Sequence, residues 1–317
     1  MQPVLATALA VSLPTFGWVI LGLALRRVGL LRDDWVEVFS RLSFNYGLPV
    51  LLFAGAARVD YGAASGARYL LAGIITTVLV SACSWAYSIL RKHPQAHRGL
   101  FVQAAFRSNL AIVGLALSVS AYGERGAVLA ALPIAVLTLL YNVIAVWVLN
   151  TTLGSQTSLR SLALGIARNP LILGISAGVV AAVVPLSVPA TVFSISAVLS
   201  TLLLPMMLVC VGASMRLSAL NAGRVLVTEA VVWRLLVAPA LLLGVCLALG
   251  VTGEPLGVIF LLLSSPVATA SFVMVVAARG DGTLAANMIV TTTLASMATV
   301  TLGFLVLLYV GMVGRPV

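Results

Sequence analysis

The sequence predicts an all-α polytopic membrane protein with ten transmembrane helices in two inverted five-helix repeats. Three observations predict this fold: the composition, the spacing of apolar segments, and a near-constant offset between the two halves of the chain. Hydrophobic residues make up 62% of the 317 positions and charged residues only 8%, whereas soluble domains carry about 25% charged residues. Because so few charges cannot cover a surface that faces water, most of the exterior is expected to face lipid.

Ten apolar segments are long enough to cross a bilayer, which takes about 20 mainly apolar residues. The first is followed by Arg26 and Arg27 and lacks the basic start of a cleaved signal peptide, so we expect it to be retained as a first helix. The predicted spans are residues 5–25, 36–57, 69–90, 99–121, 126–149, 162–183, 189–213, 225–249, 255–278 and 284–311.

The basic residues predict the orientation. With the N-terminus outside, most of them fall at the inner ends of the spans, and the outer side keeps only Arg58, Arg68, Arg125 and Arg315. This positive-inside bias favours both termini on the outside. The net charge of +10 does not indicate nucleic acid, because the basic residues are scattered singly between apolar runs and form no stripe.

Matched residues in the two halves predict an internal repeat. Because each half would hold five helices, the second half would enter the membrane from the opposite side, as in many secondary transporters. We therefore expect one repeat at residues 1–154 and the other at residues 155–317. The matched positions, 156 or 157 residues apart, are Pro14 and Pro170, Gly22 and Gly178, Leu48-Pro49 and Leu204-Pro205, Gly123-Glu124 and Gly280-Asp281, and Asn109 and Pro266.

The fourth span holds a buried basic residue beside two poor helix formers. Arg107 lies in FRSNLAIVGLAL, about two turns inside the membrane, where an Arg usually faces a cavity or a partner. An Arg at this depth can also extend to the inner headgroups. Ser108 and Asn109 compete for backbone hydrogen bonds, so this stretch is expected to unwind and to contact a substrate or an ion.

The ninth span carries the matching break in SSPVATASF. Pro266 removes a helical hydrogen bond, and Thr269 and Ser271 are small and hydroxylated, which lets another backbone approach. An ordinary proline kink is the alternative reading. If Asn109 and Pro266 are symmetry mates, the two broken helices cross near the midplane, and their half-helix N-termini present positive dipole ends to an anion.

Other polar or helix-breaking residues are weaker candidates. Asn45 and Asn142 either line the substrate cavity or bond a neighbouring helix. Pro49 is expected to shorten or break the second span, and Pro205 is its counterpart in the seventh. Arg234 is expected to form an ion pair, either with the nearby Glu229 or with another helix.

The carboxylates argue against several function classes. All eight Asp and Glu residues fall in loops or near the ends of the spans, which disfavours transporters that load protons or sodium on buried carboxylates. A site built from Arg, amides, hydroxyls and helix ends instead predicts an anionic substrate. Nothing in the sequence matches a catalytic motif or a metal-ligand spacing, so we expect neither an enzyme nor a metal or cofactor site.

Six segments together carry a family resemblance that covers nearly the whole chain. In them the sequence resembles the auxin efflux carrier family, above all its short bacterial members described as malonate or organic-acid permeases. The segments are FNYGLPVLLF (44–53), FRSNLAIVGLAL (106–117), LYNVIAV (140–146), ARNPLILGISAG (167–178), LPMMLVCVGASM (204–215) and SSPVATASF (264–272).

The resemblance implies crossed, broken fourth and ninth helices, and scaffold and transport domains that are each assembled from both repeats. It also implies an elevator-like fold similar to that of bile-acid sodium symporters, with carriage of small organic anions. Arg107 and Asn109 match the family's Arg-x-Asn stretch, and Pro266 matches its proline in the ninth helix. The chain departs from the family at Ala116, where a proline is common, which puts the exact crossing point in doubt.

These observations favour a secondary transporter of a small mono- or dicarboxylate. A sodium-coupled symporter of the bile-acid type is the main alternative, and a membrane-embedded enzyme or receptor fits least well. The expected partners are the organic anion, membrane lipid, Na⁺ or H⁺ as a coupling ion, and a second copy of the chain in a homodimer. Nucleic acid is not expected.

Overall fold

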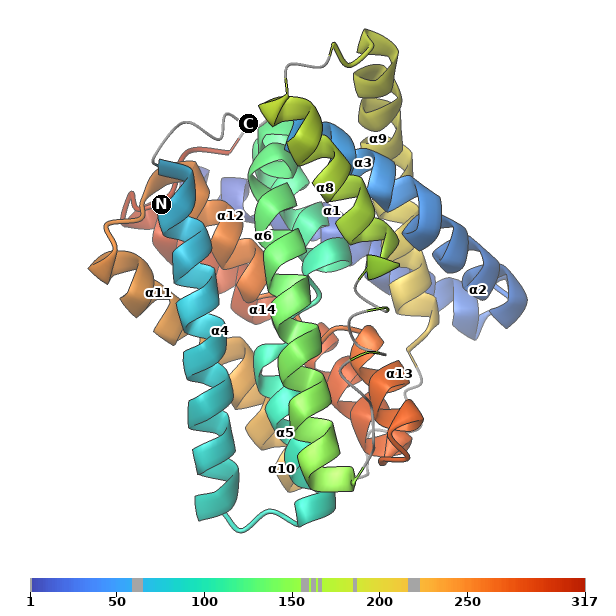
Figure 1. Cartoon of the computed structure of the whole chain (residues 1–317), viewed down its shortest axis with the longest axis vertical. Helices are drawn as coiled ribbons and strands as arrows, with labels where there is room; N and C mark the ends of the chain where they lie inside the picture. Colours follow the sequence, from blue (N-terminus) through green and yellow to red (C-terminus); the bar gives the residue numbers. More distant parts are fainter. Residues whose placement is uncertain are drawn as a thin grey trace.

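The computed structural model describes residues 2–58, 65–154, 160, 164, 167–184, 187–215 and 223–316. These residues are helical or in turns, apart from one isolated antiparallel bridge between Ser108 and Val267. Figure 1 shows the helices packed into one bundle, with α4 and α6 running along its longest axis and α2 projecting at one edge. The predicted junction between the repeats adjoins residues 155–159, and the sixth span begins at residues 162–163; both stretches lie outside the described residues.

The first half of the chain forms six helices and two π-helical turns. They are α1 (Gln2–Arg27), α2 (Asp33–Leu42), η1 (Ser43–Gly47), α3 (Leu48–Ala57), α4 (Ser65–Leu90), α5 (Gln95–Phe106), η2 (Leu110–Gly114) and α6 (Leu115–Leu153).

The second half repeats this mixture of long, short and interrupted helices. Its described elements are α8 (Pro170–Val183), α9 (Ala190–Ala213), α10 (Arg224–Val232), η4 (Trp233–Val237), α11 (Ala238–Ala248), α12 (Gly253–Leu263), α13 (Ala270–Ala277) and α14 (Gly282–Tyr309).

Six of the described helical segments are long and apolar enough to cross a membrane. One of them, Leu110–Leu153, is too long for a single span. Gly123 divides it, with φ of 55° and ψ of −138° inside α6, at the boundary that the sequence predicts between the fourth and fifth spans. Several other predicted spans consist of two shorter helices, such as α12 and α13, and so do not count as single long helices. The six spanning segments are Leu5–Arg27, Arg68–Leu90, Leu110–Leu153, Ala190–Ala213, Arg224–Ala248 and Gly282–Tyr309.

Two of the three prolines predicted to break helices, Pro49 and Pro205, do not end a helix at their own positions. Pro205 lies inside α9, which continues from Ala190 to Ala213, so no break is found there. Pro49 occupies the first turn of α3, where its missing N–H costs little, and the irregularity of that helix is the π-helical turn η1 just before it. A proline within a spanning helix removes one hydrogen bond, which the surrounding helix tolerates.

Glycines allow two pairs of helices to pack at close range. Gly22 of α1 lies against the main chain of Val209 in α9, and Gly178 of α8 lies against the main-chain oxygen of Phe53 in α3. A Cβ atom at either glycine would collide with its neighbour. Small residues commonly mark such contacts between membrane helices, so these glycines fix how closely the paired helices approach.

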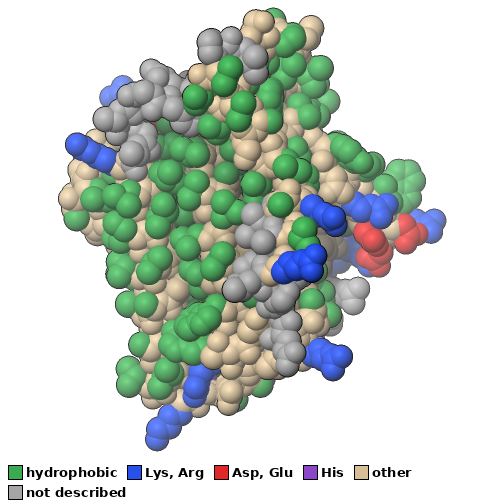
Figure 2. Space-filling view, in the orientation of Figure 1, with side chains coloured by type: hydrophobic (Ala, Val, Ile, Leu, Met, Phe, Trp, Pro, Cys, Tyr) green, Lys and Arg blue, Asp and Glu red, His purple; other side chains and the backbone are tan. Residues whose placement is uncertain are grey.

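The outer surface is mostly apolar, and charges gather at its margins. Figure 2 shows a face covered mainly by hydrophobic side chains, with Lys and Arg near its edges. Several exposed ion pairs join segments that are distant in the sequence: Arg58 with Glu124 at 2.5 Å, Arg125 with Glu254 at 3.3 Å, and Arg91 with Glu229 at 3.0 Å. The hydrogen bonds that Arg91 donates to the carboxylate of Glu229 raise the pKa of Arg91. Each pair contributes little stability alone, but it shows that the two segments it joins lie side by side.

Candidate functional site

Two helices stop inside the bundle and meet through their main chains. α5 ends at Phe106 and α12 ends at Leu263. Between them the N–H of Asn109 donates to the carbonyl of Pro266 at 2.8 Å, and the N–H of Ala268 donates to the carbonyl of Arg107 at 3.0 Å. We call this join, residues 107–109 with 266–268, the crossover. Its two bonds satisfy main-chain groups that would otherwise be unpaired in the apolar interior.

The two breaks in the crossover have different local causes. Pro266 has no N–H and ends the α12 segment. The break after α5 contains no proline. Position 116, where the related family commonly has one, is Ala within α6. The chain instead leaves the helix at Arg107 (φ −85°, ψ 89°) and Asn109 (φ −81°, ψ 69°). It resumes through the π-helical turn η2, whose Gly114 lies against Leu262 of α12.

Arg107 is itself part of the crossover and carries a buried positive charge. The residue is 6% exposed, and its Nη2 donates to the Oδ1 of Asn142 at 2.9 Å. Its Nε and Nη1 have no hydrogen-bond partner in the part of the chain that the structure describes. Leaving charged donors unpaired in a protein interior is unfavourable by about 1–3 kcal/mol or more, so this guanidinium would gain from an acceptor.

The hydrogen bond from Arg107 to Asn142 leaves enough guanidinium donors to bind a carboxylate. The Nη2 atom carries two hydrogens, and the single bond to Asn142 uses one of them. Either the edge formed by Nε and Nη2 or the edge formed by Nη1 and Nη2 therefore keeps both its donors. A carboxylate binds such an edge through two parallel hydrogen bonds, which is the strongest form of Arg recognition.

Arg107 lines a cavity of about 580 Å³ beside the crossover. Four other residues predicted for the site line the same cavity: Ser108, Asn109, Asn142 and Thr269. The Oγ of Ser108 lies 2.9 Å from the hydroxyl of Tyr141, which also lines the cavity. The half-helices that begin at Leu110 and Ala270 both start next to it, so their positive dipole ends lie close to the same space.

Three predicted site residues do not line this cavity. Asn45 lies in η1 with an exposed side chain. Pro266 is buried and takes part in the crossover through its carbonyl group rather than its ring. Ser271 is 4% exposed, and its Oγ has no hydrogen-bond partner among the described residues. The sequence motifs predict these three residues for the site, but a motif gives no information on the direction in which a side chain points.

The cavity also contains polar residues that the sequence did not single out. Tyr141 precedes Asn142 in the LYNVIAV segment, and Asn169 belongs to ARNPLILGISAG. Asn169 is the N-cap of α8, where its Oδ1 accepts the N–H of Leu171 at 3.0 Å. Both segments carried the family resemblance, which is the one signal in the sequence that could have pointed to them.

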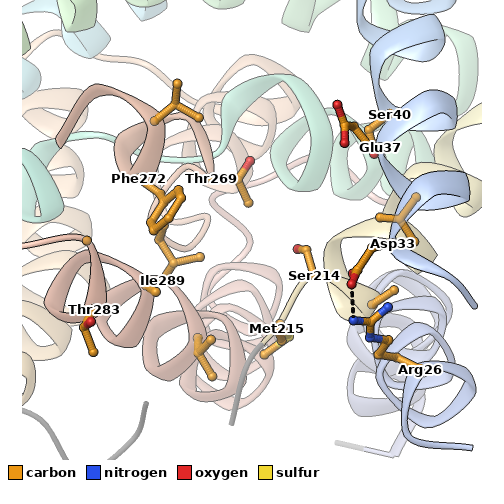
Figure 3. Close-up of a pocket in the computed structure, with 16 residues that line it drawn as sticks. Arg26, Asp33, Glu37, Ser40, Ser214, Met215, Thr269, Phe272, Thr283 and Ile289 are labelled. Atoms are coloured by element: carbon orange, nitrogen blue, oxygen red, sulfur yellow. Dashed lines mark hydrogen bonds and ion pairs between the residues drawn. The ribbon is translucent and has the colours of Figure 1, made fainter. Parts of the chain in front are cut away.

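A second, larger cavity adjoins the first. Its volume is about 950 Å³, and Ser40, Ser214 and Thr269 line both cavities. Figure 3 shows it between α2, which carries Asp33 and Glu37, and the helices that carry Thr269, Phe272 and Ile289. The ion pair of Arg26 with Asp33, at 2.6 Å, lies at its edge. We call this space the vestibule, because it leads from the charged end of α2 toward the crossover.

Arg234 lies against the carbonyl ends of α5 and α12 and does not form the expected ion pair. Glu229 instead bonds Arg91 at 3.0 Å and lies 2.7 Å from the Nε2 of His93. Arg234 is 1% exposed and donates to the main-chain carbonyls of Ala105, Phe106 and Leu263. The prediction was wrong because main-chain carbonyl groups at a helix end leave no trace in the sequence.

Comparison with protein families identifies the class to which this chain belongs. A family model described as a membrane transport protein matches residues 8–303. This chain belongs to that family. The match confirms the resemblance to the auxin efflux carriers, which the same model covers. It also establishes an integral membrane protein that transports a small molecule and is not an enzyme.

One curated relative spans nearly the full length. It is a protein of Rhizobium meliloti (strain 1021) named a putative malonate transporter, 28% identical over 296 residues. The alignment covers 91% of this chain and 92% of the relative. The similarity therefore extends over nearly the whole of both chains rather than one segment.

Proposed function

We propose that this protein is a secondary transporter of a small organic anion, and that Arg107 binds the carboxylate of its substrate. One observation carries the proposal: Arg107 is only 6% exposed as a residue, lines a cavity, and keeps two guanidinium nitrogens without partners among the described residues. Two half-helix N-termini beside the cavity add positive potential there. An anion would satisfy both features at once.

The substrate class we propose is the small mono- or dicarboxylates. The relative from Rhizobium meliloti is named for malonate, and a three-carbon dicarboxylate is small compared with a cavity of about 580 Å³. Asn142 and Thr269 offer polar contacts around Arg107. Asn109, Ser108 and Tyr141 complete the polar side of the proposed site.

We propose that the ten helical segments form two inverted repeats around this site. The close contact of Gly22 with Val209 and that of Gly178 with Phe53 support this, because Gly22 and Gly178 differ by 156 positions, and so do Phe53 and Val209. The same pair of contacts thus occurs twice, with the roles of the halves exchanged. The two main-chain bonds of the crossover also exchange donor and acceptor between the halves, at an offset of 159 positions rather than 156.

We propose that the vestibule faces the cytoplasm and that this conformation is open to the inside. The predicted topology puts Arg58 and Glu124 on the outer side and Arg91 and Glu229 on the inner side, and both of these ion pairs agree with that assignment. The vestibule begins at Arg26 and Asp33, which the topology assigns to the inner side. A bacterial inner membrane and a homodimer complete the proposal.

The test of the proposed function is binding of carboxylates to purified protein and to the Arg107→Ala variant. We expect malonate or a related carboxylate to raise the thermal stability of the wild-type protein. We expect Arg107→Ala to weaken that binding at least tenfold, because charge-assisted hydrogen bonds contribute about 1.5–3 kcal/mol each. Unchanged affinity in a variant that is folded and inserted would remove Arg107 from the site.

A further inference from the structure

Arg234 has surroundings that differ in kind from those of Arg107. It lies in the π-helical turn η4, between α10 and α11. Its Nη1 donates to the carbonyl of Ala105 at 3.0 Å and to that of Phe106 at 2.8 Å, and its Nη2 donates to the carbonyl of Leu263. These carbonyl groups are the last of α5 and of α12. One guanidinium therefore caps two half-helices at once.

The charges at the crossover can be compared in order of magnitude. The C-terminal end of each half-helix carries about −0.5 of an elementary charge. The two ends together carry about −1, which the single positive charge of Arg234 balances. Neither Arg234 nor Arg107 forms an ion pair with a carboxylate within the described ranges. Arg107 is then the positive charge that the crossover itself leaves unbalanced.

Carbonyl groups freed at half-helix C-termini are also the groups that bind coupling cations in transporters with broken helices. We propose that Arg234 is a built-in cation at this position. Its guanidinium neutralises both half-helix ends and occupies the place where a coupling ion would bind, so that Na⁺ cannot bind there. The inference rests on the proposed anion site. It goes further by predicting that the anion binds without Na⁺ and by assigning Arg234 a positioning role.

The experiment compares the wild-type protein with Arg234→Ala in sodium chloride and in choline chloride. The first measurement is thermal stability without any anion substrate. We expect Na⁺ to leave the wild type unchanged and to raise the unfolding temperature of Arg234→Ala by about 3 °C, because a cation that binds only the folded state stabilises it. Arg125→Ala, which removes an exposed arginine paired with Glu254, controls for general salt effects and should show no such difference.

The second measurement is the dissociation constant for malonate in the same two salts. We expect the wild type to bind equally in both, within about twofold. We expect Arg234→Ala to bind at least about fivefold more weakly in choline, with recovery on addition of Na⁺ or guanidinium. We expect Arg234→Lys to retain more affinity in choline than Arg234→Gln, because Lys keeps the charge. If Arg234→Ala does not fold, the comparison of Arg234→Lys with Arg234→Gln still tests the inference.

The outcomes separate this inference from the proposed function. Wild-type binding that requires Na⁺ would overturn the inference, and so would an Arg234→Ala variant that behaves like the wild type. Equal loss in the Lys and Gln variants, with no rescue by either cation, would overturn it as well, since the role would then be structural only. If no carboxylate binds the wild type but Na⁺ still stabilises only Arg234→Ala, the proposed function fails and the built-in cation stands.

Discussion

At the scale of single residues, the two buried arginines of the crossover differ in what their guanidinium groups contact. Arg234 donates to three main-chain carbonyl groups, and among the described residues only its Nε lacks a partner. Arg107 donates to one side chain, and two of its nitrogens have no partner among the described residues. Donors that are mostly paired with the main chain hold a structure together, whereas buried donors that are mostly unpaired favour binding of a ligand.

Asn142 fixes the direction of Arg107, so we predict that Asn142→Leu weakens carboxylate binding. Loss of the 2.9 Å bond to Nη2 frees the guanidinium to rotate away from the cavity, and a hydrogen bond to a charged group contributes about 1.5–3 kcal/mol. We expect the dissociation constant for malonate to rise about tenfold or more, measured by calorimetry. Asn142→Asp, which presents a competing carboxylate to Arg107, should weaken binding further. Equal or tighter binding in the Asp variant would contradict this role.

At the scale of helices and their ends, some elements of the site could be predicted from the sequence. Arg107 and Pro266 could be recognised because each is unfavourable inside a spanning helix. Asn169 and Tyr141 could not be recognised from their own chemistry, because an N-cap and an aromatic residue are ordinary at their positions. The role of Arg234 was hidden for another reason: its partners are main-chain atoms, which every residue type carries.

The helix boundaries, too, could be predicted only in part from the sequence. Gly123 and Gly280 were matched in the sequence, and in the structure they separate the two halves of Leu110–Leu153 and the α13–α14 pair. Pro205 was expected to act similarly, but α9 continues through it. A proline shows only that one hydrogen bond is missing, and packing decides whether the helix ends there.

The glycine contacts allow a prediction at this scale. We predict that Gly22→Val and Gly178→Val each destabilise the protein, because the added side chain would collide with the main chain of Val209 or Phe53. Overpacking typically costs about 1–3 kcal/mol, so we expect a fall of several degrees in the unfolding temperature.

Gly17→Val is the matched control on α1, because a Cβ at Gly17 meets nothing within 4 Å. It should change the unfolding temperature little. If Gly22→Val and Gly17→Val had equal effects, the close approach of α1 and α9 would not be a determinant of stability.

At the scale of the whole molecule, the two cavities form a path that ends at the crossover. Helices of the first half and of the second half both line the vestibule, from Arg26 and Asp33 on one side to Thr283 and Ile289 on the other (Figure 3). A carboxylate entering here would pass from a charged opening to a buried cation. Closing that path would require these two groups of helices to approach each other.

Cys210 provides a probe of this path, since it lines the cavity that contains Arg107 and is partly exposed. We predict that a membrane-impermeant maleimide labels Cys210 faster from the cytoplasmic side than from the outside, and that malonate slows the labelling. The measurement uses inside-out and right-side-out vesicles in a background with Cys83→Ala and Cys246→Ala.

The control is Gln95→Cys in a background without the three native cysteines, because Gln95 is exposed at the start of α5 and lines neither cavity. Malonate should leave its labelling rate unchanged. Equal labelling of Cys210 from both sides would contradict a cavity that opens to the cytoplasm.

The main-chain bridge between Ser108 and Val267 has a consequence for how such proteins diverge. Because peptide groups make the join, most side chains around it can be exchanged without undoing it. Asn142 and Asn169 stand on other helices, and Thr269 follows the bridge without donating to it. Relatives could therefore acquire new cargoes through a few substitutions at such positions while the frame stays intact, and a laboratory library confined to them is a direct route to altered substrate range.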